Sequence, residues 1–503
     1  MKSIKQLLKL SLFGLFLLKT QIGISQKNNY KPISGYEVHK DTISRIISSL
    51  KTPAYDHRLE RKKAITKFEE ICQERSNYIK NLNDAGLIMT GDTITNWINE
   101  VLFRLVEANP MLQELNYKVY THRSSICNAY NIGEGVILIN LGLLMSIDSE
   151  EELAFVLAHE ISHDILKHVM ESTKEQSALY GDKDYLKSLK KASKLEYGAY
   201  TELERILLAV MSNKMLHSRG NEYLADSLGF ELYSKADYDF FGAIGLLEVL
   251  DSSDYFIYDF DIDLKQYLTT EGFELNDEWF SNEDLDPIWS KMEHLYEIPD
   301  SLKTHPGCDE RIASVKRIAK IKEEVKVKKT GSYIEYEGII KFELIQSLIE
   351  DSRPVEAMYY AVKLLELEPE NTYLHCVMAN SILEIHDALK NMEFRWYVPF
   401  PDESFPLGYN KILSFFHNMN SKKLQSLFLA YVSQHITDSD SDDFVTYVQF
   451  RKRYFKNEIT LDQIIEYEDE IKNTYFKQKV EVQKENYSKN KLDNLKNDSK
   501  TKK

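Results

Sequence analysis

Apolar residues recur at helical intervals between residues 149 and 169, and they predict a buried helix of about six turns. The apolar positions are Leu153, Val156, Leu157, Ile161, Ile165 and Val169. Ser149 and Glu152 have the spacing of a capping box. The acidic run at 148–152 suits a helix N-terminus, where carboxylates interact favourably with the helix dipole. The pattern therefore predicts one continuous helix from residue 149 to about 169.

A short strand is predicted just before this helix. Residues 136–139 (Val-Ile-Leu-Ile) combine β-branched side chains with leucine, and Gly133 and Gly135 before them suit a turn. The pattern predicts a short strand at 136–139.

Helical spacing also dominates residues 333–470. Within them, residues 341–369 loosely match a tetratricopeptide repeat, which is a helix–turn–helix unit. The matching positions are Leu344, Leu348, Ala357, Ala361, Leu364 and Pro369. The large aromatic residue and the glycine of the first helix are missing, so a plain helical hairpin is the alternative. We expect a degenerate repeat-like helical domain here.

The first 25 residues have the pattern of a secretory signal peptide. Three lysines precede an apolar run at 10–18, and small residues at 23–25 offer a cleavage site. Nine helical residues cover only about 14 Å, less than half of a ~30 Å hydrocarbon core. No later run reaches the length of a membrane span. We expect an exported chain, periplasmic or secreted, that is soluble and has no transmembrane span once the signal peptide is removed.

Three polar side chains lie within the predicted helix at 149–169 and form a His-Glu-x-x-His motif: His159, Glu160 and His163. Residues four apart on a helix lie about 40° apart around its axis, so both imidazole rings can reach one metal ion. Glu160 lies beside the first ligand, where its carboxylate can take a proton from an activated water. The motif is short enough to arise by chance, so the interpretation requires a third ligand.

Glu222 is the candidate third ligand. Asp226 follows it by one helical turn, so the two carboxylates share a face. One can bind the metal while the other accepts the outer N–H of a ligand histidine. Catalytic zinc has three protein ligands and one open position, so we expect one zinc ion per chain. A solvated acidic pair is the alternative.

His168 is a rival ligand that helical geometry argues against. It follows His159 by nine residues, which on one continuous helix places it about 180° around the axis, facing away from the metal. The metzincin pattern requires glycine at 166 and histidine at 169, but the chain has Leu166 and Val169. The expected site is therefore two histidines and one glutamate.

With three further segments, this motif resembles peptidase family M48, the gluzincin metalloendopeptidases that include CAAX-processing proteases. The four segments stand in the family's order within residues 90 to 320, and they are Asn128–Leu144, Leu157–His168, Ser218–Gly229 and Thr304–Arg311. The resemblance implies a mainly α (α+β) fold, in which a helical metalloprotease domain has a small β-sheet at its cleft and a helical domain follows.

The resemblance also implies roles for residues outside the motif. The strand with Val136, Ile137 and Leu138 would edge the cleft and pair with an extended substrate; an ordinary buried strand is the alternative. His305 and Arg311 would stabilise the oxyanion. His305 would otherwise occupy the open metal position and hold the enzyme latent.

The remaining segments complete the predicted organisation. Residues 27–85 are expected to form a helical extension, and residues 86–320 the protease domain. The acidic, aromatic segment 251–300 is interpreted as a lid or substrate wall, with a peripheral subdomain as the alternative. Residues 472–503 contain many lysines and asparagines and few large apolar residues, which predicts a disordered tail.

Charge and cysteine content narrow the choice of partners. The net charge of −16 argues against nucleic acid. Four widely scattered cysteines fit no disulfide framework, so buried free thiols are favoured over disulfides. We expect a protein or peptide substrate, and a protein partner for the C-terminal helices. The predicted function is a zinc metalloendopeptidase in the cell envelope, with a place in protein quality control. The alternative is a latent protease that acts mainly as a binding scaffold.

Overall fold

The chain forms two compact units in the computed structural model, which describes residues 62–133, 135–192, 219–252, 262–280, 307–320, 331–402, 405–437 and 442–501. The first unit holds the described residues up to 252 together with those from 307 to 344. The second holds those from 262 to 280 and from 345 onwards. The predicted signal peptide and most of the predicted N-terminal extension lie outside the described residues.

A four-stranded sheet lies in the first unit, with the strand order β1-β2-β4-β3. The strands are β1 (Ile88–Met89), β2 (Lys118–His122), β3 (Ala129–Gly133) and β4 (Val136–Asn140). β2 and β4 are parallel, and the other two pairs are antiparallel. Gly133 and Gly135 have φ angles of 94° and 74°, which L side chains rarely adopt, so the predicted turn is confirmed.

The predicted strand exists, but its expected place at the cleft edge is wrong. β4 pairs with β2 on one side and with β3 on the other, and all five of its residues are buried. Val136, Ile137 and Leu138 therefore have no free backbone edge to offer a substrate. The strand beyond β4 is β3, and β3 packs against the helix that carries the His-Glu-x-x-His motif.

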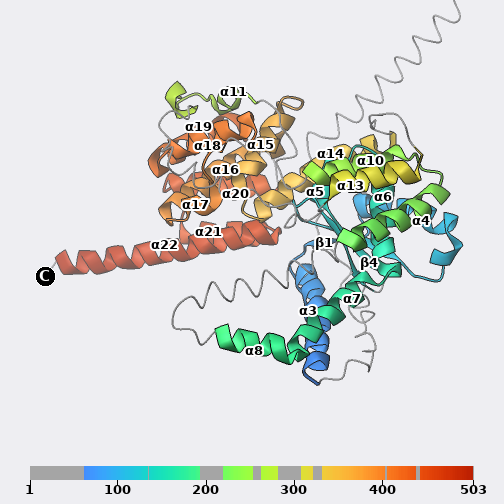
Figure 1. The fold of residues 1–503 in the computed structure, drawn as a ribbon. Coiled ribbons are helices and arrows are strands. Elements are labelled where there is room, and N and C mark those ends of the chain that lie inside the picture. The colour runs from blue at the N-terminus through green and yellow to red at the C-terminus, as the bar shows by residue number, and fades with distance from the viewer. Residues whose placement is uncertain are drawn as a thin grey trace, which may run out of the picture. The chain divides into compact units, whose positions relative to one another are not determined.

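Helices surround this sheet (Figure 1). They include α3 (Lys62–Asp84), α4 (Thr93–Ala108), η3 (Pro110–Leu112), α5 (Leu141–Ser146), α6 (Glu150–Ile165), α7 (His168–Gly181), α8 (Lys183–Ala192), α10 (Phe241–Ser252), α13 (Cys308–Ile318) and the first part of α14 (Gly331–Glu350). A further helix covers residues 219–235. α6 is the central helix, since it packs against α4, α10 and β3.

α6 begins where the sequence predicts and ends earlier. Ser149 is its N-cap and accepts a hydrogen bond from the Glu152 backbone N–H at 3.2 Å. The helix stops at Ile165, and Lys167 has a left-handed φ of 58°. α7 then starts in a new direction and packs along α3 (Figure 1). The prediction of one helix reaching residue 169 is therefore wrong.

The second unit is helical. Its elements are α11 (Leu264–Leu268), η4 (Asp277–Phe280), α15 (Pro354–Leu365), α16 (Thr372–Lys390), α17 (Phe394–Tyr397), α18 (Leu407–His417), α19 (Ser421–His435), α20 (Asp443–Phe455), α21 (Leu461–Glu470), α22 (Thr474–Thr501) and the end of α14. α16 packs against α15, α19 and α20, and most of its residues are buried. The mainly helical fold with a small sheet is confirmed.

The described part of the acidic, aromatic segment packs in the second unit. Phe280 stacks on Phe415 of α18 with ring centroids 5.2 Å apart, and the Lys423 ammonium lies 4.4 Å from the Trp279 ring. The Glu271 backbone N–H donates to Gln434 of α19 at 2.7 Å. For residues 262–280 these contacts favour the peripheral subdomain over the lid.

The predicted disordered tail is helical from residue 474 to 501, so that prediction is wrong. Phe476 and Val480, one helical turn apart, are 2% and 0% exposed, and Phe476 stacks on Phe444 and Tyr447 of α20. Lys479 pairs with Glu384 at 2.8 Å. Two well-spaced apolar side chains and neighbouring carboxylates outweigh a composition that by itself predicts disorder.

Two further expectations are tested by the described residues. All four cysteines are buried thiols that form no disulfide, as predicted. None of the described helices combines the length and the apolar composition needed to cross a membrane.

Candidate metal centre and cleft

Two helices of the first unit bring the three predicted metal ligands together. α6 carries His159 and His163, and the helix at 219–235 carries Glu222. The second helix approaches closely because it has a glycine at the crossing: a Cβ at Gly229 would lie 3.2 Å from the backbone of His159. Only glycine lets the two backbones come this near without displacement.

The three donor groups form a small triangle. The Nε2 atoms of His159 and His163 are 3.0 Å apart. Glu222 oxygens lie 3.4 Å from His159 Nε2 and 3.5 Å from His163 Nε2. Ligand atoms about 2.0–2.1 Å from a tetrahedral zinc are about 3.3 Å from one another. The triangle therefore fits three of the four positions around one tetrahedrally coordinated ion. Among the described residues, these three side chains form the group of His, Cys, Asp or Glu residues that lie close enough together to hold a metal.

Asp226 supports His159 from the side opposite the triangle. Its Oδ1 lies 3.0 Å from His159 Nδ1, as the sequence predicts for the outer partner of a ligand histidine. Burial alone would raise the pKa of Asp226, but hydrogen bonds from Arg311 and His159 hold it below its ordinary value. The carboxylate therefore stays charged and holds the His159 ring so that Nε2 faces the triangle.

Arg311 is buried behind the carboxylates. It is 1% exposed, donates from Nε and Nη2 to Asp226 at 2.7 and 2.9 Å, and places Nη1 3.0 Å from Glu222 Oε2. All three of its nitrogens thus face carboxylates. This placement differs from the oxyanion-binding position expected from the resemblance. His305, the other expected oxyanion residue, lies outside the described residues.

The electrostatics of the triangle favour a positive charge. Burial would lower the pKa of His159, yet Asp226 and Glu222 raise it to about 10. Carboxylates that increase the proton affinity of a ring also increase its affinity for a cation. Burial and the neighbouring His159 lower the pKa of His163 to about 3, so His163 is neutral, the form in which imidazole binds metals.

Glu160 is held in place by hydrogen bonds from Asn131 of strand β3. Its Oε2 accepts a hydrogen bond from the Asn131 backbone N–H at 2.8 Å, and its backbone carbonyl accepts one from Asn131 Nδ2 at 3.2 Å. Burial raises the pKa of Glu160 to about 7. A carboxylate with this pKa can both take up and release a proton near neutral pH, as a general base and acid must. Asn131 on β3 is a site residue that the sequence did not indicate, because its role depends on the packing of β3 against α6.

His168 lies beside the site, contrary to the sequence-based argument. Its Nδ1 is 2.9 Å from Nδ1 of His163, and it is 9% exposed. On one continuous helix His168 would face away from His159, but α6 ends at Ile165 and the chain changes direction before His168. No glycine or proline marks this break in the sequence.

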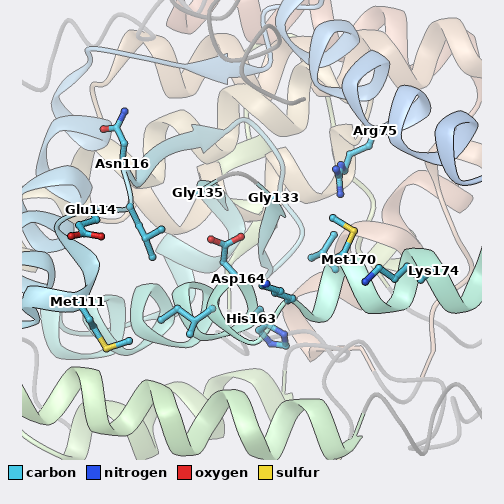
Figure 2. A pocket seen from close by; sticks show the side chains of 14 residues that line it. Arg75, Met111, Glu114, Asn116, Gly133, Gly135, His163, Asp164, Met170 and Lys174 are labelled. Atoms are coloured by element: carbon cyan, nitrogen blue, oxygen red, sulfur yellow. The ribbon is translucent and has the colours of Figure 1, made fainter. Parts of the chain in front are cut away.

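A cleft of about 700 Å³ opens beside His163 (Figure 2). It is lined by the turn between β3 and β4, by the end of α6, by α7 and by Arg75 of α3. Figure 2 shows Arg75 and Lys174 at one end of the cleft and Glu114 at the other. Asp164 lies between them, beside His163. α3, part of the predicted N-terminal extension, thus forms one wall of the cleft.

Comparison with known proteins agrees with this geometry. Residues 93–319 match the model of peptidase family M48. The chain is 26% identical over 164 residues to the beta-barrel assembly-enhancing protease of Yersinia pestis, covering 32% of this chain and 34% of that protein. It is 29% identical over 143 residues to the metalloprotease YcaL of Escherichia coli K12, covering 28% of this chain and 52% of that protein. It is 34% identical over 77 residues to the human mitochondrial metalloendopeptidase OMA1, covering 15% of each.

The matched segments span about a third of the beta-barrel assembly-enhancing proteases and about half of YcaL. The match at 93–319 includes strands β2, β3 and β4, α6, the helix at 219–235 and α13. The motif and the donor triangle lie in the first unit and within the matched residues, and the chain therefore contains a peptidase family M48 domain.

Proposed function

We propose that this chain is an exported zinc-dependent metalloendopeptidase that cleaves proteins or peptides in the cell envelope. The observation that carries the proposal is the donor triangle of His159, His163 and Glu222, with Glu160 adjacent and the cleft beside it. The triangle supplies two imidazoles and one carboxylate, the ligand set of several zinc peptidases.

In this proposal the residues have separate tasks. His159, His163 and Glu222 would hold zinc, which when bound lowers the pKa of a water and polarises the scissile carbonyl. Glu160 takes a proton from the attacking water on its carboxylate and later donates it to the leaving amine. Asn131 orients Glu160 through its backbone N–H, which lies 2.8 Å from Oε2. Asp226 keeps His159 oriented, and Arg311 neutralises the two carboxylates it contacts.

Export and an envelope role rest on the sequence and on the relatives. The lysines and the apolar run of residues 1–25 have the pattern of a secretory signal peptide. The Yersinia pestis relative is named for beta-barrel assembly, which makes envelope proteins the substrate class to test first. The helices at 341–390 would serve as a repeat-like platform for a protein partner.

The test of the proposed activity is Glu160→Gln. The amide keeps the size of the side chain but cannot take up the proton, so we expect zinc content to be unchanged and peptide cleavage to fall by at least about a hundredfold. Glu171→Gln is the matched control because Glu171 is exposed on α7, where its carboxylate pairs with Lys174. Equal turnover by Glu160→Gln and the wild type would refute the proposed mechanism.

A further inference from the structure

The two candidate ligand histidines have different outer partners. On His159, Nδ1 faces the Asp226 carboxylate at 3.0 Å. On His163, Nδ1 faces the imidazole Nδ1 of His168 at 2.9 Å, and the two rings meet edge to face at 73°. Ligand histidines generally have their outer N–H held by a carboxylate, a carbonyl or water. A second histidine in that place therefore needs an explanation.

The break between α6 and α7 places His168 there. Along an unbroken helix, the nine-residue separation would turn His168 away from His159. Instead Lys167 takes a left-handed φ of 58°, and His168 becomes the first residue of α7. α7 is held in this direction by packing against α3, α6 and β3. The position of His168 is thus fixed by a helix packed on three neighbouring elements and not by an exposed loop.

The hydrogen-bonding roles follow from the geometry. His163 Nε2 faces the donor triangle and must offer a lone pair there, so its proton belongs on Nδ1. That N–H points to His168 Nδ1, which must accept it and therefore carries its own proton on Nε2. A lone pair at His168 Nδ1 is what selects the His163 tautomer that can bind a metal.

We infer that His168 is a positioning residue, which fixes the tautomer and ring orientation of His163 in the proposed metal centre. The inference rests on the proposed function, since it needs a metal at the triangle. It also makes the site asymmetric: one ligand imidazole is supported by a buried carboxylate held by Arg311, and the other by a neutral imidazole.

Metal binding by the full chain tests this role. We would compare wild type, His168→Leu and His168→Asn, titrating Zn²⁺ against a chromophoric chelator and recording the visible spectrum of the Co²⁺ form. Leu removes the acceptor, so we expect Zn²⁺ affinity to fall by about 10–100-fold. The Asn amide oxygen can accept near the place of Nδ1, so we expect His168→Asn to recover most of the affinity. The Co²⁺ spectrum should keep its intensity in both variants, because the ligand set is unchanged.

Thr173→Val is the matched control. Thr173 is a buried polar residue on the same helix, and its hydroxyl donates to the Val169 carbonyl at 2.7 Å, away from the triangle. We expect wild-type affinity from this variant. Thermal unfolding of the metal-free proteins separates loss of folding from loss of binding, and His168→Ala replaces the leucine variant if that one unfolds.

The outcomes separate the inference from the proposed function. If the wild type takes up neither Zn²⁺ nor Co²⁺, the proposed function itself fails. If the wild type binds and His168→Leu binds equally well, the role of His168 is refuted while the metal centre stands. A Co²⁺ spectrum of altered intensity in His168→Leu would make His168 a direct ligand and would also overturn the inference.

Discussion

Each unit of the protein contains a buried arginine paired with an aspartate. The two pairs differ in which other residues the arginine and the aspartate contact. In the first unit Arg311 binds Asp226 at 2.7 and 2.9 Å. In the second unit Arg451 donates from Nη2 to both oxygens of Asp387 at 3.1 and 2.9 Å. Both arginines are 1% exposed. The two pairs therefore share the same ion types and an equally buried arginine.

The surroundings give the two pairs different consequences. Asp226 also contacts His159, and Arg311 also contacts Glu222, so the first pair is connected to two of the candidate metal ligands. Arg451 instead donates to the Tyr447 hydroxyl at 3.2 Å, and Asp387 contacts His386. A buried ion pair thus reveals little about function by itself. The third residue that each partner contacts decides whether the pair only stabilises the fold or also orients a site.

Removing Asp226 should have the largest effect. Asp226→Ala leaves Arg311 buried beside one carboxylate and leaves His159 without its outer partner. We expect the free energy of unfolding to fall by about 3–5 kcal/mol and Zn²⁺ affinity to fall by about 10–100-fold. Denaturant unfolding and chelator competition measure the two effects. Unchanged zinc affinity would remove the functional difference between the pairs.

Removing Asp387 should affect stability alone. Because its side chain is 29% exposed, water can partly replace it, and we expect Asp387→Ala to cost about 2–3 kcal/mol. Zn²⁺ content and peptide cleavage should match the wild type. A loss of zinc affinity in this variant would mean that the second unit acts on the metal centre, contrary to this account.

The stability contributed by the pair of Asp387 and Arg451 should also depend on pH in the acidic range. Burial would raise the pKa of Asp387, but Arg451 and His386 lower it to about 2. A carboxyl whose pKa is lower in the folded state contributes stability above its unfolded pKa of about 3.9, and loses it as the pH falls toward 2. The difference in unfolding free energy between wild type and Asp387→Ala should therefore shrink across this window. A difference that grows on acidification would contradict the assigned pairing.

The smallest effect is expected from an exposed pair on the same helix as Asp226. Glu231 and Lys235 lie 2.7 Å apart but are 62% and 46% exposed. Glu231→Gln should change the free energy of unfolding by less than about 1 kcal/mol and leave zinc binding unchanged. This variant shows whether burial, rather than charge alone, distinguishes Asp226. A loss comparable to that of Asp226→Ala would rule out that explanation.

The sequence predicts the chemistry of the centre better than its surroundings. His159, Glu160 and His163 lie on one helix whose cap and periodicity are local features, and Asp226 follows Glu222 by one turn. These relations depend only on spacing along a helix. The uniformly apolar run at 136–139 is also typical of a strand buried on both faces. Its central place in the sheet could therefore have been predicted from the sequence.

Other features depend on tertiary contacts. The left-handed Lys167 is not a glycine or asparagine, so nothing local marks the end of α6, and the place of His168 could not be deduced. The hydrogen bond between Asn131 and Glu160 needs β3 packed on α6. Arg311 belongs to a segment that resembles the family, but its burial behind two carboxylates follows only from the fold.

Metal content after dialysis tests the central claim most directly. We would express the wild type and Glu222→Ala, dialyse both against a weak chelator, and measure bound zinc by atomic emission. We expect about one zinc per wild-type chain, because His159, His163 and Glu222 together supply the three protein ligands of one catalytic zinc. Glu222→Ala should lose most of its zinc while remaining folded. Full zinc occupancy in Glu222→Ala would contradict the triangle of His159, His163 and Glu222, and would place the third ligand elsewhere.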